Sequence, residues 1–433
     1  MMKRVYLEDL ACAAILAFFA MQGAIPGIAP NQALEATNGV ATGLMKVGGI
    51  VSQLIVDGSI LFLILKHLRL VSRRLYAMQY AGLLGALAIL STVWSLDPLL
   101  TVRRSLPFAL AGLFGLYFAT KFPVRRQLSI FWMSMIAVAL SSIVLAICFP
   151  SMGLERSAGH QGDWQGVFTQ KNACGRVMVL ATAVVLAHER LSLSKIASLL
   201  IFVFVLIMSG SRGAWIVEAA VVALYLLLRT ISRFDIRSRV LVLLAMAVVC
   251  FALAFAAWLY LPLLTKLIGR DMTFSGRTEI WAQVWSYIVK RPVIGYGYAA
   301  FWQGMKGESF NVVAAVHFIV FHAHNGFLEI WLELGGAGLT LFVLSYIRAW
   351  RKLWPALRRG QIHRITWMFF VLVLIMLYDL DENTLLTANG LFWVVYVSAL
   401  ANIEYLAIED SLVRQIRANA KERHTYAASL ALS

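Results

Sequence analysis

Long, uninterrupted apolar runs restrict what this chain can fold into more than any other feature. Each run is roughly 17–25 residues long, the length that lets a helix cross about 30 Å of hydrocarbon. Of 433 residues, 61% are hydrophobic and 14% are charged, whereas soluble domains average about 45–50% and 25%. A water-soluble core cannot hold this excess, so the sequence predicts an all-α, polytopic membrane protein.

Twelve membrane-spanning helices are expected, within a single transmembrane domain that covers residues 1–433. The first apolar run is followed directly by others, so it reads as a retained helix and not as a cleaved signal peptide. The expected spans are residues 10–28, 47–65, 75–95, 105–120, 128–149, 173–188, 195–210, 213–228, 240–263, 326–347, 365–380 and 388–406.

The basic residues carry topological information. A net charge of +16 would point to nucleic acid in a soluble protein, but here Lys and Arg gather in short loops between alternate spans. Such loops face the cytoplasm in membrane proteins, so both termini are expected to be cytoplasmic and no nucleic-acid partner is expected. The four cysteines show no CxxC spacing, which argues against a zinc or redox centre.

Two segments on the predicted outer side are unusually long. They cover residues 149–172 and 264–325, and loops of such length are usually functional. Within the second, apolar residues recur at helical spacing and include two tryptophans, which predicts an amphipathic helix lying at the membrane interface. These residues are Ile280, Trp281, Val284, Trp285 and Ile288.

Three residues of the predicted outer side are candidates for chemistry. Arg212 lies in GSRGAW, Arg277 in SGRTEIW and His324 in HAHNGFLEIW, each beside the start of an expected helix. Helix N-termini attract anions, arginine matches phosphate geometry, and a neutral histidine can act as a general base near pH 7. Together they could hold a pyrophosphate and deprotonate a hydroxyl.

Structural roles for the same residues remain open. An arginine at a helix end commonly snorkels to the headgroups, and His324 could serve only as a loop or capping residue. His317 and His322 are expected to be ordinary loop residues. Acids within spans are functional hypotheses by default; they are Asp57, Glu218, Glu329 and Glu333. Asp379, Asp381 and Glu382 could bind a cation, but they show no recognisable metal-site spacing.

Several motifs, taken in order, resemble the O-antigen ligase and Wzy polymerase family. They span most of the chain. Their order, with a long outer loop before the last motif, indicates the family more specifically than any single motif does. The motifs are TVWSLDPLLTVRRSLP (92–107), GVFTQKNACGR (166–176), GSRGAW (210–215), SGRTEIW (275–281), KRPVIGYGYAAF (290–301) and HAHNGFLEIWLELGGAGL (322–339).

The resemblance implies a GT-C-like enzyme of the bacterial inner membrane that performs inverting glycosyl transfer on the periplasmic face. The donor would be an undecaprenyl-pyrophosphate-linked glycan and the acceptor a sugar hydroxyl of another glycan, without cofactor or metal. By family correspondence, Arg212 and Arg277 bind the pyrophosphate and His324 is the base. Membrane lipids, and a chain-length regulator or flippase, are the other implied partners.

Further substrate-binding candidates come from the same motifs. They are Lys171, Asn172, Arg104, Arg291, Asn325 and Glu329. The TQKN and GHQGDWQG pieces look most like the exopolysaccharide-polymerase branch, which favours polymerisation of exopolysaccharide or O-antigen repeat units. Two alternatives remain: an O-antigen ligase with a lipid A–core acceptor, and a polysaccharide or lipid transporter, whose polar groups would lie near the midplane.

Overall fold

The structure is a computed structural model that describes residues 7–23, 25–26, 43–156, 160–235, 238, 241, 276–317 and 319–431. Within these ranges the regular structure is helical, and one isolated β-bridge joins Leu154 to Trp164. Eight of the described helices are long and apolar enough to cross a membrane. The prediction of an all-α, polytopic membrane protein is therefore confirmed.

The helices follow the apolar runs. Apart from Leu241, the expected span 240–263 lies outside the described residues. Each of the other eleven overlaps a helical segment, although α1 ends at Ala20, before the end expected near residue 28. The helices are α1 (Leu7–Ala20), α3 (Gly43–Lys66), α4 (Leu68–Ser72), η1 (Leu75–Met78), α5 (Gln79–Leu90), η2 (Ser91–Val93), α6 (Pro98–Lys121), α7 (Val124–Cys148), α8 (Pro150–Gly153), α9 (Lys171–Leu186), α10 (Leu193–Met208), α11 (Arg212–Ile231), α13 (Arg277–Lys290), α14 (Gly307–Val316), α15 (Gly326–Arg358), α16 (Ile362–Asp379) and α17 (Leu391–Ala431).

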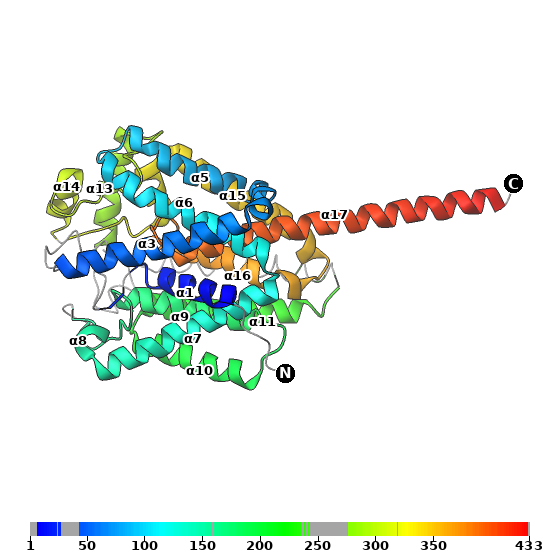
Figure 1. Cartoon of the computed structure of the whole chain (residues 1–433), viewed down its shortest axis with the longest axis horizontal. Coiled ribbons are helices and arrows are strands. Elements are labelled where there is room, and N and C mark those ends of the chain that lie inside the picture. The colour runs from blue at the N-terminus through cyan, green and yellow to red at the C-terminus, as the bar shows by residue number, and fades with distance from the viewer. Residues whose placement is uncertain are drawn as a thin grey trace.

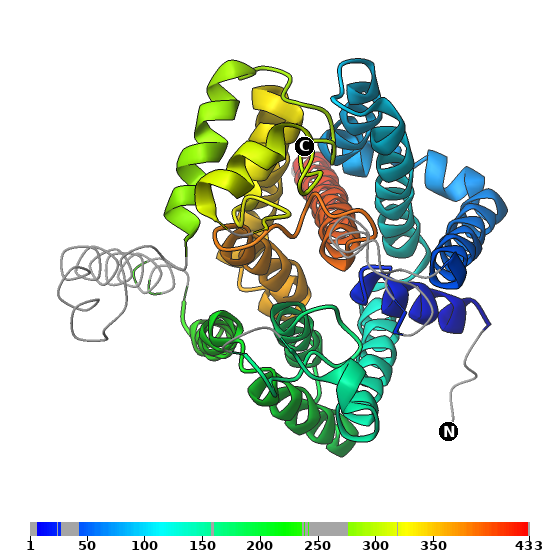
Figure 2. The same cartoon turned by 90° about the vertical axis from the view of Figure 1, so that its left-hand side faces the viewer.

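The long helices lie side by side in a bundle, which Figure 1 shows from the side and Figure 2 from one end. α9 runs through the interior, and every residue from Ala173 to Leu186 is buried. At 16 residues it is about 24 Å long, shorter than the hydrocarbon layer, and it is covered by other helices instead of lipid. Its neighbours include α7, α10, α11 and α16.

The helices α6 and α17 pack closely against each other. A Cβ added to Gly115 would lie 2.7 Å from the Val394 carbonyl oxygen, so the missing side chain lets the two backbones approach. Phe108 stacks on Trp393 with ring centroids 4.5 Å apart. Small residues that allow close packing are a common device in membrane bundles.

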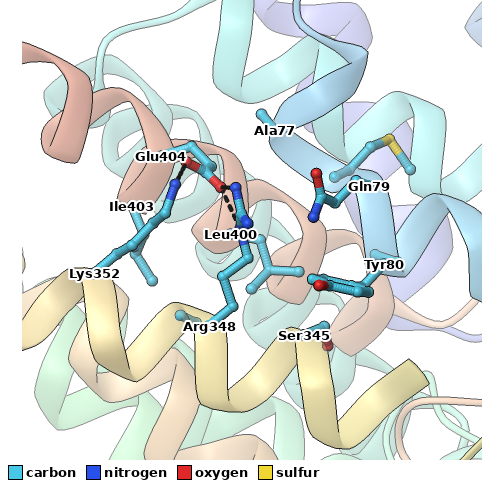
Figure 3. Close-up of a pocket in the computed structure, with 12 residues that line it drawn as sticks. Ala77, Gln79, Tyr80, Ser345, Arg348, Lys352, Leu400, Ile403 and Glu404 are labelled. Carbon is cyan, nitrogen blue, oxygen red and sulfur yellow. Dashed lines mark hydrogen bonds and ion pairs between the residues drawn. The ribbon is translucent and has the colours of Figure 1, made fainter. Parts of the chain in front are cut away.

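Ion pairs join the helices at one end of the bundle, where the predicted cytoplasmic segments meet. Glu8 contacts Lys66, and Arg126 donates to Asp9 at 2.8–3.0 Å. On α17, Glu404 accepts from Arg348 and Lys352 of α15 (Figure 3). Further pairs at this end are Arg125–Glu189, Arg359–Asp410 and Arg364–Glu409. The segments assigned to one side by the basic-loop rule thus lie together, and the side of the membrane they face stays a prediction.

The helix α15 is interrupted, contrary to the continuous span expected over 326–347. Gly335 has φ 67° and ψ −172°, which breaks the helix. Four backbone hydrogen bonds of 2.7–3.1 Å join residues 292–297 to residues 332–337 across this break. Non-helical backbone inside a membrane protein must be paired in this way, and the pairing fixes the outer loop on α15.

The outer loop has its own small core. Ile280, Val284 and Ile288 of α13 are buried against residues of α14 and α15, whereas Trp285 is 48% exposed. The predicted helix is present, but most of its apolar face packs on the protein itself. Contact of α13 with the membrane surface stays a prediction.

Candidate active site

Five segments converge at the end of the bundle opposite the ion pairs just described. They are the starts of α9, α11 and α13, the loop before α15 and the turn after α16. Arg277 of α13 pairs with Asp381 of that turn, and a Cβ on Gly213 of α11 would lie 3.4 Å from Asp381 Oδ2. Arg176 of α9 reaches the neighbouring residue, Glu382.

Glu382 is the centre of this cluster. Its carboxylate lies 3.4 Å from Arg176 Nη1, 3.7 Å from Arg277 Nη2, 3.7 Å from His322 Nε2 and 3.6 Å from His324 Nδ1. Burial alone would raise the pKa of the Glu382 carboxyl, but Arg176 and the two histidines outweigh it and hold that pKa well below its usual range. Glu382 is therefore an anion at neutral pH.

The two histidines have different hydrogen-bonding roles. His322 Nδ1 accepts from the His324 backbone N–H at 3.1 Å, so the neutral His322 ring carries its proton on Nε2, which faces Glu382. Burial and the neighbouring His324 lower the pKa of His322. The one nitrogen lone pair of the neutral His322 ring is thus already engaged by the His324 backbone N–H. His324 presents Nδ1 to Glu382, and in the tautomer with a proton on Nδ1 its Nε2 lone pair stays available.

The backbone around His324 is held from several directions. Ala323 N–H donates to Glu329 Oε2 at 2.7 Å, and Ala323 C=O accepts from Trp281 Nε1 at 3.0 Å. Asn325 caps α15 through hydrogen bonds from Phe327 and Leu328 N–H. His324 itself has φ 50°, an unusual conformation for a non-glycine residue that surrounding contacts must maintain.

The cations of the site differ in their availability. Arg176 is buried against Glu382, and Arg277 is shared by Asp381 and Glu382. Arg212, the first residue of α11, is exposed and has no acidic partner among the residues that the structure describes. Of these arginines, Arg212 is therefore the most available to an incoming anion.

Lys171 and Asn172 lie at the edge of the cluster. Lys171 Nζ donates to Asp163 Oδ2 at 2.7 Å and lies 2.7 Å from His160 Nδ1. Asn172 Oδ1 accepts from Ser211 Oγ at 3.0 Å, which joins the starts of α9 and α11. The Asn172 contact reaches the residue that directly precedes Arg212, whereas the printed contacts of Lys171 are with the loop before α9.

Two of the predicted binding residues lie elsewhere. Arg104 Nη1 donates to the Ala299 carbonyl at 2.7 Å and so joins α6 to the outer loop. Arg291 follows the last residue of α13 and lies over the Tyr296 ring at 4.8 Å. It is a whole helix length from Arg277, about 20 Å. The structure gives both arginines roles in fixing the loop.

Asn325 and Glu329 are near the histidines but act on the backbone. Asn325 caps α15 and its Nδ2 donates to the Leu380 carbonyl at 3.2 Å. Glu329 is 1% exposed and accepts from Ala323. In this structure both residues position the histidine segment.

A metal could be considered at this site, because one ligand atom each from His322, His324 and Glu382 lie within 4.8 Å of one another. However, Arg176 and Arg277 share the same carboxylate, and their positive charges oppose a bound cation. The alternative acidic cluster is not assembled either, because Asp379 turns inward and accepts from Thr384 N–H at 2.8 Å. The donor set fits a metal ion poorly.

Sequence reasoning did not assign three of the central residues to the site. His322 was expected to be an ordinary loop residue, Glu382 was considered only as a cation ligand, and Arg176 was not considered. The signal for Arg176 was its place in the motif GVFTQKNACGR, and that for Glu382 was an acid following an apolar run. Neither pattern tells which distant segments meet.

The fold and the site together define a polytopic membrane protein with a histidine–carboxylate pair beside an arginine cluster at one end of its bundle. Residues 197–343 match the Wzy_C family, described as O-antigen ligase. This stretch contains Arg212, Arg277 and His324, so the resemblance seen in the motifs is confirmed for the part that holds these three residues.

Two curated proteins are similar to this chain. "Exopolysaccharide production protein ExoQ" of Rhizobium meliloti is 27% identical over 278 residues, which cover 60% of this chain and 62% of ExoQ. A Rickettsia prowazekii protein described as "Putative polysaccharide ligase" is 33% identical over 81 residues, which cover 18% of this chain and 20% of that protein. The chain thus spans less than two thirds of the length of either relative.

Proposed function

We propose that this protein is a glycosyltransferase that joins glycans by inverting transfer from an undecaprenyl-pyrophosphate-linked donor to a sugar hydroxyl on the periplasmic face. The observation that carries the proposal is the His324–Glu382 contact at 3.6 Å, set beside Arg212 and Arg277. It combines a base, an orienting anion and cations at helix N-termini in one cluster.

In the proposed reaction His324 Nε2 accepts the proton of the acceptor hydroxyl. The acceptor oxygen forms a bond to the anomeric carbon from the face opposite the leaving group. The bond from that carbon to the pyrophosphate oxygen breaks, and its electron pair leaves with undecaprenyl pyrophosphate. Glu382 stabilises the imidazolium that forms at His324, as a carboxylate does in other histidine pairs.

The growing charge on the leaving group is matched by fixed positive groups. Arg212 and Arg277 are the first residues of α11 and α13, so the free N–H groups and positive dipole ends of both helices lie close by. Preorganised donors of this kind stabilise charge that develops in a transition state. Because these arginines supply the positive charge at the leaving group, we propose that the reaction needs no metal ion.

Polymerisation of repeat units is the activity we favour over ligation. The supporting observation is the similarity to ExoQ, which extends over 278 residues. Transfer to a lipid A–core acceptor is the second candidate, because the matching family is described as O-antigen ligase. The two differ in acceptor and share the same proposed donor site.

The test is a transfer assay with purified protein in lipid nanodiscs and a polyprenyl-pyrophosphate-linked oligosaccharide, with EDTA present. A ladder of products from donor alone indicates polymerisation, whereas products only with lipid A–core indicate ligation. The His324→Ala variant is the matched control. Strict dependence on a divalent cation, or no transfer to either acceptor, would overturn the proposal.

A further inference from the structure

A polar cavity of about 360 Å³ lies at the opposite end of the bundle from the histidines. Its walls come from the ends of α9 and α11 and the start of α16. This is within the size range of small-ligand sites in proteins. The lining includes His188, Glu189, Tyr225, Arg229, Arg233 and His363.

The charges of this cavity are unbalanced. Its one acid, Glu189, already accepts from Arg125 at 2.6–3.1 Å. Arg125 is not part of the lining. Arg229 and Arg233 have no acidic partner among the described residues. Arg229 lies over the Tyr225 ring at 5.2 Å, which orders the guanidinium without neutralising it. Within the part of the chain that the structure describes, the lining therefore offers two guanidinium groups without a neutralising acid.

A second basic cavity at this end, among the described residues, differs in size and charge. It lies between α5, α15 and α17 (Figure 3), and its accessible space is about 20 Å³. Both of its cations, Arg348 and Lys352, contact Glu404. These two cations are neutralised by Glu404 and hold α15 and α17 together. The cavity at α11 is larger, and its arginines have no such partner among the described residues.

We propose that the cavity between α9, α11 and α16 binds the phosphate group of an anionic ligand through Arg229 and Arg233. Arginine is well suited to phosphate because its donors match the oxygens in pairs. Basic pockets between transmembrane helices on the cytoplasmic side characteristically hold anionic headgroups.

The setting of the cavity favours a phospholipid as the source of that phosphate. Arg229 lies in the last turn of α11, whose outer face is apolar and exposed at Ile216, Val222 and Leu226. A phospholipid with its tails along this face would bring its headgroup to the level of Arg229. A soluble phosphate compound entering from the water side is the other source.

The test compares Arg229→Gln/Arg233→Gln with a control that removes the same charge elsewhere at this end. Arg69 and Arg73 of the α4 region are exposed and outside the cavity, so Arg69→Gln/Arg73→Gln is the matched control. Binding of fluorescent phosphatidylglycerol to detergent-purified protein is measured, with phosphatidylcholine as the uncharged reference. Two surface-level arginines correspond to about a 10- to 30-fold loss of affinity.

The expected result is that loss in the cavity variant and little change in the control. Competition by inorganic phosphate or glycerol phosphate would assign the site to a soluble ligand; its failure would assign it to lipid. Equal losses in both variants would mean unspecific surface attraction, and no loss in either would mean no site. Both outcomes overturn the proposal. If the double variant is not produced, single Arg233→Gln and the charge-preserving Arg233→Lys give the same comparison.

Discussion

At the scale of single residues, the His322-Ala323-His324 segment places two similar rings 4.0 Å apart in different environments. The His322 lone pair is engaged by a backbone N–H, whereas the Nε2 lone pair of His324 is available in the tautomer protonated on Nδ1. Two histidines that are only two positions apart thus differ in their hydrogen bonds, and their spacing in the sequence does not reveal this difference.

This difference predicts unequal effects of substitution. His324→Ala should lower turnover by about 10²–10⁴-fold, the usual loss for a general base, with donor binding largely kept. His322→Ala should be much milder. Turnover and donor-lipid binding are measured on protein whose membrane expression has been confirmed. Near-normal turnover in His324→Ala with loss in His322→Ala would show that the assignment is reversed.

Arg212 should act on the donor. Because it lacks an acidic partner among described residues, Arg212→Ala should raise the donor KM by about 10- to 100-fold, the loss of a charged hydrogen bond. Arg212→Lys should recover only part of this, since lysine lacks the planar fork. Steady-state kinetics against donor concentration give the measurement. An unchanged KM with normal transfer would remove Arg212 from the site.

Glu382 supplies a pH-dependent prediction. Its pKa is held below the unfolded value of about 4.3, so the stabilisation from its ion pairs is complete above about pH 5. That stabilisation is lost as the pH falls through the depressed folded pKa. Glu382→Gln leaves Arg176 buried without its anion, which should cost about 3–5 kcal/mol at pH 7.

Melting temperatures of wild type and Glu382→Gln are compared at pH 7 and pH 3. The difference should shrink at the lower pH, because the ion-pair stabilisation from the Glu382 carboxylate is partly lost there. A stability difference that is the same at both pH values would contradict the role given to this carboxylate.

At the scale of elements, the apolar runs predicted the helices well because hydrocarbon thickness sets their length. They did not predict the break in α15, because LELGGAGL reads as part of an ordinary apolar run. The break depends on residues 292–297 docking from another segment. The same docking explains why motif residues such as Arg104 and Arg291 hold the loop and do not reach the site.

Gly335 is the element-scale test of this arrangement. With φ 67°, and a Cβ that would lie 2.1 Å from Val293 O, Gly335→Ala should destabilise the protein by at least about 2 kcal/mol. Thermal unfolding followed by tryptophan fluorescence reports the change. Gly58→Ala in α3 is the control, because its Cβ would meet no atom within 4 Å. Equal melting of both variants would rule out a structural role for the break.

At the scale of the whole molecule, the basic loops predicted which segments lie together but not how distant motifs meet. Lys66, Arg126 and Arg348 lie at one end, and His324 lies at the other. This separation of the basic residues from His324 is expected, because successive helices cross the membrane in alternating directions. The meeting of Arg176, His324 and Glu382 depends on helix packing order, which hydropathy does not encode.

The orientation of the bundle is tested by reporter fusions. Fusions at Asp235 and Arg358 should read cytoplasmic, and a fusion near Gly304 should read periplasmic, because the basic loops remain on the cytoplasmic side. Paired alkaline phosphatase and green fluorescent reporters make the measurement. A cytoplasmic signal at Gly304 would place the histidines away from a donor presented outside.

The interrupted α15 also bears on how the chain is assembled as it is synthesised. A helix entering lipid with unpaired backbone groups pays several kcal/mol for each one, and α15 has such groups until residues 292–297 are seated on it. That segment precedes α15 in the chain. Together with the two residues that follow it, 298 and 299, it also forms hydrogen bonds with residues 91–104, which lie still earlier in the chain. In the predicted orientation, residues 91–104 have therefore crossed the membrane before residues 292–297 need them, and residues 292–297 have crossed before α15 needs them. Synthesis from the N- to the C-terminus thus produces these segments in the order in which they can pair.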